Sequence, residues 1–315
     1  MRAMTIRDLV ADSGLPSIQH LEALTGGARM DNKLTLVTLT NGQQLLARKP
    51  IAADDLQDQA PRSSFLAQLG IGFPKVYATA PDGSSLVEWI PGVSFADRLA
   101  APETTPDPED VVWTWLGESL AAVHAVTFPQ PLQGPVGPTE LTLKPQDPVD
   151  DLLASLNRAR SWITQRGERP ANLPDRLTGL LDKHAESIRA EHPCLLHGDN
   201  NLDNFIVTEH GVRVIDWDYP EVGYPLAELS ALDEHAYLNG LLAGLPQAFW
   251  RGYGRTYPRE LILLYRAIGC INWLTQDNWR GFQTDPAISD TMKQKLHRWH
   301  GLLTSWIDTL PDLLR

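Results

Sequence analysis

The sequence is poor in cysteine and has no long hydrophobic run. Only two cysteines occur among its 315 residues, which excludes a disulfide-rich secreted domain and is typical of a reducing compartment. No apolar stretch approaches the roughly 20 residues that a membrane-spanning helix needs, and the first residues lack the apolar core of a signal peptide. From these absences we expect a cytoplasmic location and no membrane partner.

Positive charge is also scarce. Lys and Arg number 27 against 39 Asp and Glu, which gives a formal net charge of −12. Such a chain repels the phosphate backbone of nucleic acids, so we expect no nucleic-acid partner. A cationic small molecule suits the charge better, although acidity also serves solubility and does not by itself define a site.

The apolar pattern divides the chain near residue 90. Asn41-Gly42 between two apolar runs predicts a hairpin over residues 33–49, and Pro81-Asp82-Gly83 predicts a second pair of strands. Between them, residues 52–69 have a helical pattern. After Pro91 the pattern is mainly helical, apart from a proline-rich loop over 127–148. Helices are expected near residues 107–124, 149–164, 175–190, 225–245, 258–280 and 288–310.

The stretch LLHGDNNLDNFIVTEHGVRVIDWD places carboxylates and amides at the ends of short apolar strands. The runs FIV and VRVI predict a hairpin, and pairing Val207 with Val212 brings Asn204 and Asp216 to its open end. Asp199 follows another short strand and reaches the same end. The strands are the rigid support, and their polar ends form the predicted site.

The predicted cluster suits phosphoryl transfer with magnesium. This ion takes one or two carboxylates, keeps waters and binds substrate phosphates. Asp199-x-x-x-x-Asn204 has the spacing of a kinase catalytic loop, and Asp216 begins Asp-Trp-Asp where a kinase has Asp-Phe-Gly. The nearby His197 and the more distant His124 are expected to be structural, not catalytic bases.

The phrases LLHGDNNLDNFIV, VRVIDWDY, LVEWIPG and LGESLAAVHA together resemble the aminoglycoside phosphotransferase and choline kinase superfamily. LTGGARMDNKLTLV and GYPLAELS add weaker support, so that the resemblance covers roughly residues 24–232. It implies an α+β, bilobal, protein-kinase-like fold. Residues 1–90 would form a small antiparallel-sheet N-lobe that binds nucleotide. Residues 91–315 would form a large, mainly helical C-lobe with the catalytic loop, metal site and acceptor pocket.

The resemblance also assigns roles to residues, with ATP and Mg²⁺ as cofactors. Asp199 matches the catalytic base, and Asn204 and Asp216 match the metal ligands. The remaining matches concern the nucleotide. They are the loop over the phosphates (Gly26, Gly27, Asn32), the cation of the third strand (Arg48) and the hinge that meets the adenine through backbone groups (Glu88, Trp89, Ile90).

Three positions depart from the family pattern. The third strand offers Arg48 in place of the usual lysine, with Lys49 on the opposite face. The helical glutamate that pairs with this cation is replaced by Arg62 in the register we choose, and Asp218 stands where a protein kinase has glycine. The role of Asp218 is left open between metal, substrate and structure. Possible substitutes for the glutamate are Asp54, Asp55 and Asp58.

The predicted function is an ATP-dependent phosphotransferase that moves the γ-phosphate to a hydroxyl of a small, cationic molecule. Choline-, aminoglycoside- and thiamine-like acceptors, and also sugars, stay open, as does the oligomeric state. A protein kinase is disfavoured because no G-x-G-x-x-G loop is present and no Ala-Pro-Glu segment follows Asp216. The alternatives are a nucleotide-binding pseudokinase or regulatory protein without phosphotransfer and, less well supported, a metal-dependent hydrolase.

The acceptor pocket is predicted on the helix near 258–280. Trp273 and Asp277 lie one turn apart and away from the apolar stripe, so they present an indole and a carboxylate to an amine. Arg266 lies near the same face and is expected to compete for Asp277. The apolar stripe consists of Leu261, Leu264, Tyr265, Ile268 and Ile271.

Overall fold

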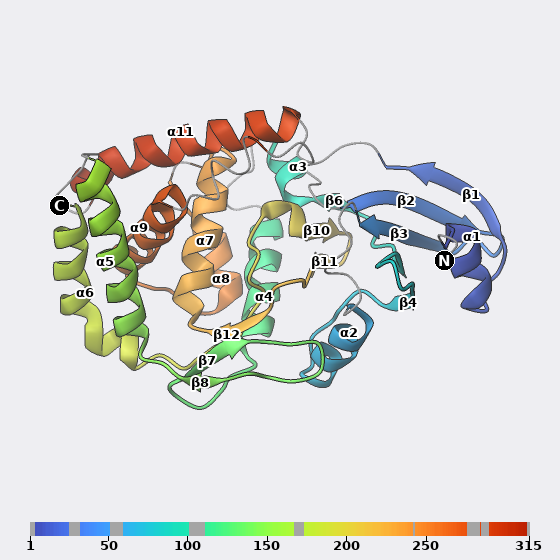
Figure 1. Ribbon diagram of the computed structural model, residues 1–315, viewed down its shortest axis with the longest axis horizontal. Coiled ribbons are helices and arrows are strands. Elements are labelled where there is room, and N and C mark those ends of the chain that lie inside the picture. Colours follow the sequence, from blue (N-terminus) through green and yellow to red (C-terminus); the bar gives the residue numbers. More distant parts are fainter. Residues whose placement is uncertain are drawn as a thin grey trace.

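The computed structural model of the chain has a sheet at one end and helices at the other (Figure 1). It describes residues 4–24, 32–50, 59–100, 111–166, 173–241, 243–275, 284 and 290–313. The N-terminus lies at the sheet end and the C-terminus at the helical end (Figure 1). The predicted α+β architecture, with a small antiparallel sheet and a larger helical part, is confirmed.

The sheet has five antiparallel strands in the order β1-β2-β3-β5-β4. Its strands are β1 (Ile18–Ala23), β2 (Asn32–Leu39), β3 (Gln44–Pro50), β4 (Val76–Thr79) and β5 (Ser85–Glu88). The predicted hairpin at Asn41-Gly42 joins β2 to β3, with Gly42 at a positive φ of 84° that its turn requires. The edge strand β1 was not predicted, because five of its six residues are exposed.

The sheet has an apolar core of its own. Buried side chains from α1 (Ile6–Asp12), β2, β3 and β5 form it: Val10, Val37, Leu39, Leu45, Ala47 and Leu86. The helix α2 (Gln59–Gln68) packs against β4. The predicted helix at 52–69 is therefore found in its second half, while residues 51–58 lie outside the described part.

A short segment links this sheet to the strands of the predicted site. After β5 the chain enters β6 (Val93–Ser94), which pairs with β10 (Phe205–Thr208). Gly92 allows this close approach, since a Cβ there would lie 2.3 Å from the carbonyl oxygen of Val207. The segment that follows the predicted hinge is thus paired directly with the predicted hairpin.

The helical part surrounds a second and larger apolar core. Its helices are α3 (Phe95–Ala100), α4 (Val111–His124), α5 (Pro148–Arg166), α6 (Leu173–Arg189), α7 (Pro225–Leu238), α8 (Gln247–Tyr253), α9 (Arg259–Thr275) and α11 (Asp290–Leu313). Within the described residues, no helix is both long enough and apolar enough to span a bilayer. Both cysteines are buried and unpaired, as expected.

Two sequence predictions about these helices are wrong. The helix expected over 225–245 ends at Leu238, and α8 starts separately after Pro246. Gly240 and Gly244, both at positive φ, make the turn between them. The helix α9 does not have a single apolar stripe, because residues 261–268 are all buried. It lies inside the helical part, in contact with α5, α6, α7 and α11.

Short strands extend from the predicted site toward the proline-rich loop. That loop is not irregular throughout, since it contains β7 (Leu132–Pro135) and β8 (Lys144–Pro145). They continue a sheet in the order β8-β7-β12-β9, in which β9 (Cys194–Leu196) and β12 (Glu221–Gly223) flank the site. The hairpin of β10 and β11 (Gly211–Val214) has the predicted register, with Val207 opposite Val212.

The helices α4 and α8 cross with their backbones nearly in contact. A Cβ on Gly117 of α4 would lie 2.2 Å from the carbonyl oxygen of Phe249 and 2.6 Å from the backbone nitrogen of Tyr253. On the other side, a Cβ on Gly252 would lie 2.0 Å from the carbonyl oxygen of Thr114. Glycine at this crossing lets α4 and α8 pack at a distance that a side chain would prevent.

We predict that Gly117→Ala lowers the free energy of unfolding by about 1–3 kcal/mol, the usual cost of overpacking. Gly179→Ala is the matched control: this glycine is exposed in α6 with nothing within 4 Å of its Cβ position. The control should gain about 0.5–1 kcal/mol from helix propensity. Urea unfolding of the three proteins measures both effects, and equal behaviour of the two variants would contradict the proposed packing.

Candidate active site

The three residues predicted at the site converge on one rim of the β10–β11 hairpin. Asp199 follows β9 and its carboxylate accepts the backbone N–H of Asn201 at 3.1 Å. The side-chain amide of Asn204 donates to the carbonyl oxygen of Asp199 at 3.3 Å. The backbone N–H of Ile215 donates to the carbonyl oxygen of Asn204 at 2.9 Å. These bonds join the loop of residues 197–204, called below the His-Gly-Asp loop, to the segment that carries Asp216.

Asp216 is held in an unusual backbone conformation. Its φ of 64° makes it the only residue other than glycine with positive φ among the described residues. This left-handed conformation is unfavourable for most side chains, and such strain is often found at functional sites. Here it turns the chain sharply between β11 and the buried Trp217.

Arg48 crosses from the five-stranded sheet to this rim. Its guanidinium lies 2.9 Å from Oδ1 of Asp216 and 3.6 Å from Oδ2 of Asp218. Arg48 and Lys49 lie on opposite faces of β3, as strand alternation predicts, and Lys49 is exposed. One cation thus faces two carboxylates, with the Arg48 side chain only 12% exposed.

The donor set at this rim suits a magnesium ion. No group of three or more His, Cys, Asp and Glu side chains that could hold a metal is found in the part of the chain described. The rim instead offers the carboxylates of Asp216 and Asp218, near enough to share one cationic partner, and the amide of Asn204. Magnesium needs few protein ligands because it keeps several waters and takes others from substrate phosphates.

The predicted hinge follows β5. Glu88 pairs with Leu45 across the strands, its carboxylate accepts the backbone N–H of Lys75 at 3.0 Å, and Trp89 and Ile90 are half-buried. Of the predicted phosphate loop, Gly26 and Gly27 lie outside the described residues. For Asn32 only the backbone is described, as the first residue of β2.

In the part of the chain that the structure describes, Arg48 pairs with Asp216 and Asp218 and not with a helical glutamate. Arg62 lies in α2, and its Nε is buried without a hydrogen-bond partner in the part of the chain described. The substitutes proposed from the sequence, Asp54, Asp55 and Asp58, lie outside that part. Asp216 is the residue that takes the shorter ion pair with Arg48.

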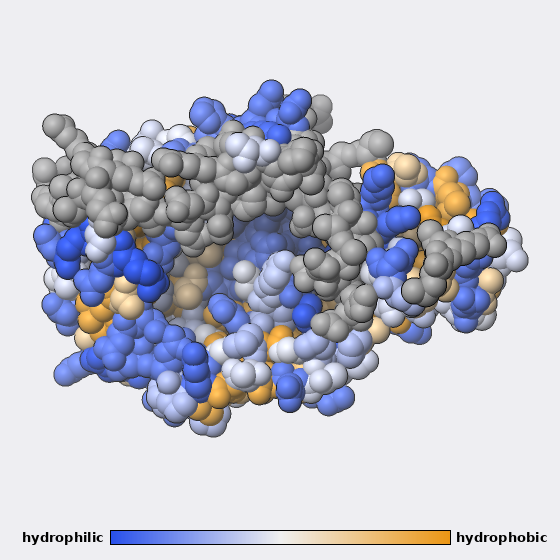
Figure 2. All heavy atoms as spheres, in the orientation of Figure 1, coloured by the Kyte–Doolittle hydropathy of each residue, from blue (hydrophilic) through white to orange (hydrophobic). Residues whose placement is uncertain are grey.

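The molecular surface is hollowed near this rim. Figure 2 shows the recess at the centre of the molecule, in front of the region where Figure 1 draws α7, β10 and β11. Hydrophilic residues predominate at the back of the recess (Figure 2). A polar recess beside converging carboxylates is suited to a charged, hydroxyl-bearing ligand.

Comparison with known proteins bears directly on this arrangement. The profile of the phosphotransferase enzyme family matches residues 20–263. The chain belongs to the phosphotransferase enzyme family. The prediction of a small-molecule phosphotransferase is thereby confirmed, without identifying its acceptor. A search of curated protein sequences gave no match.

Solved structures similar to this phosphotransferase support the fold. The choline kinase LicA from Streptococcus pneumoniae has a TM-score of 0.53 at 18% identity, covering 93% of this chain and 96% of its own. The macrolide 2'-phosphotransferase MphH from Brachybacterium faecium has a TM-score of 0.60 at 17% identity, covering 92% and 96%. The ADP-bound aminoglycoside phosphotransferase APH(2'')-Ib has a TM-score of 0.53 at 16% identity, covering 92% and 95%.

The predicted acceptor residues of this phosphotransferase are only partly described. Trp273 is half-buried against the main core, with its ring centroid 6.1 Å from that of His300, and Asp277 lies outside the described residues. The expectation that Arg266 neutralises Asp277 is wrong. Arg266 is buried between the rings of Tyr237 and Trp306, and it pairs with Asp233 at 2.9 Å.

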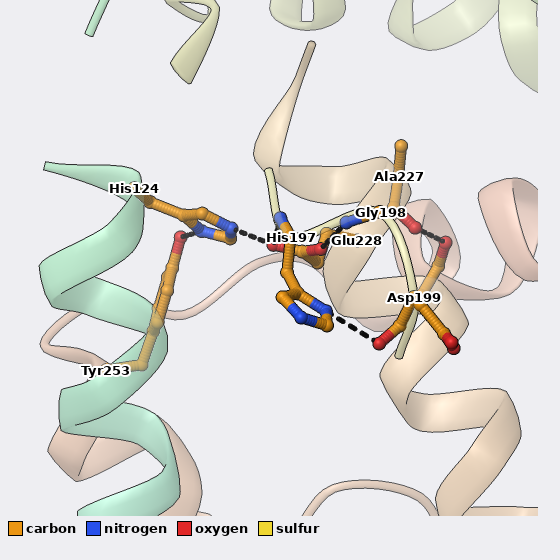
Figure 3. Close-up of polar contacts among 8 residues, drawn as sticks. His124, His197, Gly198, Asp199, Ala227, Glu228 and Tyr253 are labelled. Atoms are coloured by element: carbon orange, nitrogen blue, oxygen red, sulfur yellow. Dashed lines mark hydrogen bonds and ion pairs between the residues drawn. The ribbon is translucent and has the colours of Figure 1, made fainter. Parts of the chain in front are cut away.

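A buried network behind the His-Gly-Asp loop was missed by sequence reasoning. Glu228 of α7 accepts the backbone N–H groups of His197 at 3.2 Å and of Gly198 at 3.0 Å. Its carboxylate also contacts Nε2 of His124 at 2.7 Å, and Nδ1 of His124 contacts the hydroxyl of Tyr253 at 2.8 Å (Figure 3). The weak signal for Glu228 was its place in GYPLAELS, which carried no assigned role.

His197 joins the two halves of the site. Its Nδ1 lies 2.7 Å from the carbonyl oxygen of Asp199, and its Nε2 lies 2.8 Å from that of Ile215. The ring therefore bridges the backbone of the His-Gly-Asp loop and the segment that carries Asp216. The expectation that His197 and His124 are structural fits these contacts.

The environment of Glu228 favours its charged form. Burial alone would raise the pKa of this carboxyl group. The hydrogen bond and charge of His124, the charge of His197 and the N–H of Gly198 outweigh burial, so the pKa of Glu228 is lowered from its ordinary value of 4.5. The carboxylate therefore stabilises the fold above about pH 4.5, and this contribution is lost as the pH falls through the lowered pKa.

We predict that Glu228→Gln lowers the free energy of unfolding by about 3–5 kcal/mol at pH 7, the cost of breaking a buried ion pair. The difference from the unmodified protein should shrink at low pH, where Glu228 becomes protonated. Urea unfolding at several pH values measures it, with Glu118→Gln on the exposed face of α4 as the control. A pH-independent difference, or none, would contradict the charged network.

Proposed function

We propose that this phosphotransferase moves the γ-phosphate of ATP to a hydroxyl group of a small molecule. The observation that carries the proposal is the convergence of Asp199, Asn204 and Asp216 at one rim, opposite a cation from the other lobe. Phosphoryl transfer needs positioned groups and charge compensation more than covalent chemistry from the protein.

Asp199 is the proposed base. Its loop is fixed from behind by Glu228 and His197, so its carboxylate stays at a defined place relative to Asn204. It accepts the proton of the acceptor hydroxyl as the oxygen attacks phosphorus. Because these hydrogen bonds join side chains and backbone groups of the protein itself, the loop is organised before any substrate arrives.

Asn204 and Asp216 are the proposed metal ligands, and Asp218 is near enough to join them. Magnesium, when bound, would neutralise the phosphate oxygens and align the transferred group. Arg48 then exchanges its carboxylate partner for the phosphates of the nucleotide, which also form strong charge-assisted bonds with guanidinium groups. After this exchange, the guanidinium of Arg48 on β3 would bind the nucleotide.

The nucleotide is proposed to lie between the sheet and the helical part. Backbone groups of Glu88, Trp89 and Ile90 meet the adenine, and Gly26, Gly27 and Asn32 cover the phosphates. The family match and the fold shared with an ADP-bound phosphotransferase support a nucleotide site. In this proposal residues 1–90 hold the nucleotide and residues 91–315 supply the chemistry and the acceptor pocket.

The acceptor is proposed to be cationic. Proteins of similar fold include a choline kinase and an aminoglycoside phosphotransferase, both named for amine-bearing acceptors. The net charge of −12 agrees in sign, and Trp273 and Asp277 remain proposed parts of the pocket. A reducing, ATP-containing compartment such as the cytoplasm suits the reaction and the two free cysteines, and this location stays a prediction.

The second candidate is a nucleotide-binding regulatory protein without phosphotransfer. The observation that favours it is that, within the described residues, Arg48 pairs with Asp216 and Asp218 and not with a helical glutamate. All three proposed catalytic positions nevertheless carry competent side chains. Turnover of ATP in the presence of a panel of choline-, aminoglycoside-, thiamine- and sugar-like acceptors separates the two candidates.

We predict that Asp199→Asn lowers kcat by roughly 10²–10⁴-fold, the usual contribution of a general base, and leaves ATP affinity nearly intact. The change preserves shape and removes the proton acceptor. ADP release measures kcat with the best acceptor of the panel, and calorimetry measures ATP binding. Asp308→Asn, an exposed residue of α11, is the control. An Asp199→Asn variant with most of its activity would exclude Asp199 as the base.

A further inference from the structure

A lysine from the last helix reaches the His-Gly-Asp loop. α11 crosses over α7 and α9 (Figure 1) and contacts both. Nζ of Lys295 on α11 lies 3.6 Å from Oδ2 of Asp203, four residues after Asp199 on the loop. The other oxygen of Asp203 accepts a hydrogen bond from the hydroxyl of Ser94 at 3.1 Å, and this bond fixes the carboxylate. The carboxylate of Asp203 is therefore fixed in place where it faces the ammonium group.

The same ammonium group lies over an aromatic ring. Nζ of Lys295 is 4.6 Å from the ring centroid of Trp299, one turn further along α11. The indole is fixed in turn by His235 of α7, whose ring meets it edge to face with centroids 5.7 Å apart. A carboxylate and an indole face together are the features by which proteins recognise organic cations.

His235 adds an unsatisfied polar atom beside this cation. Its Nδ1 is shielded from solvent and has no hydrogen-bond partner in the described part of the chain. Burial lowers the pKa of His235 to about 4, an effect opposed by Asp199 and Asp203 and reinforced by Lys295. The ring is therefore neutral at pH 7, so one of its two nitrogens has a lone pair that can accept a hydrogen bond.

We propose that the cationic group of the acceptor binds where Nζ of Lys295 now lies, between Asp203 and Trp299 and beside His235. In this proposal, which rests on the proposed function, Lys295 is an internal competitor that a cationic acceptor displaces. A neutral acceptor leaves it in place. Lys295 thus sets the affinity of the enzyme for amines without taking part in proton transfer.

Three properties of the site support displacement. The side chains of Lys295 and Asp203 are 29% and 27% exposed, so their ion pair is open to solvent and weak. The lysine stem is long and flexible, and it comes from a helix distinct from the His-Gly-Asp loop. Asp203 is on the same loop as Asp199, so an ammonium held there keeps a nearby hydroxyl of the same small molecule beside the base.

Lys295→Met tests the proposal because it removes the ammonium and keeps an unbranched stem over Trp299. For a cationic amino alcohol we expect KM to fall about twofold to fivefold, the effect of removing a weakly paired competitor, with kcat little changed. A neutral acceptor of similar size should keep its KM. Asp203→Asn should have the opposite effect and raise KM for the cationic acceptor alone.

Lys293→Met, on the same helix, is the matched control and should change neither KM. Calorimetry of the amino alcohol without nucleotide gives a second readout, with tighter binding expected for Lys295→Met and weaker binding for Asp203→Asn. Thermal unfolding confirms that each variant is folded, and Lys295→Gln replaces Lys295→Met if the latter is not.

The outcomes separate this inference from the proposed function. If no acceptor of the panel is phosphorylated, the proposed function fails. If acceptors are phosphorylated but Lys295→Met leaves the KM of the amine unchanged, Lys295 is not a competitor and the inference is wrong. A raised KM in that variant, or a preference for anionic acceptors, would also overturn it, because Lys295 would then bind the acceptor directly.

Discussion

A buried carboxylate must be satisfied, and the way in which Glu228 is satisfied organises the whole candidate active site. An unpaired charge at this depth would cost several kcal/mol. Two backbone N–H groups of the His-Gly-Asp loop and one histidine of α4 provide the partners. The loop therefore takes its conformation from α7 and α4. Gly198, at a φ of 85°, is needed because a Cβ there would lie 2.0 Å from the carbonyl oxygen of Tyr219.

The other residues of the site are positioned, in turn, by contacts that start from the loop held by Glu228. The two ring nitrogens of His197 contact the carbonyl oxygens of Asp199 and Ile215, which fixes the two segments relative to each other. Asp216 then takes a strained backbone conformation and meets Arg48 from the sheet. Rigid support lies in the helical part, whereas the partner of Asp216 comes from the other lobe. A nucleotide bound between the lobes would contact the rigid helical part on one side and Arg48 of the sheet on the other.

The parts of the fold predicted from sequence depend on local signals. Asn41-Gly42 and the β10–β11 hairpin have turn chemistry and apolar alternation within a few residues, so their registers follow from nearby sequence. Asp199, Asn204 and Asp216 lie on one short stretch, and their convergence follows from that hairpin. The C-terminal end of α7, by contrast, was predicted wrongly, because Gly240 and Gly244 were not recognised as the turn that separates α7 from α8.

The parts that were missed depend on packing between distant segments. Glu228 contacts His124 across 104 residues, and nothing local marks either side chain as a partner of the other. Residues 261–268 of α9 are all buried because several helices surround them, so the expected single apolar stripe does not exist there. Arg266 pairs with Asp233 for the same reason. The approach of Lys295 to Asp203 likewise requires the path of α11.

The central claim is that Asp216 binds a magnesium–nucleotide complex at the rim it shares with Asp199 and Asn204. Calorimetric titration of ATP into the protein and into Asp216→Ala, each with and without Mg²⁺, tests it most directly. The account predicts that Mg²⁺ strengthens ATP binding in the unmodified protein and that the variant loses this dependence, because Asp216 would hold the metal through its carboxylate. An unchanged magnesium dependence in Asp216→Ala would contradict it.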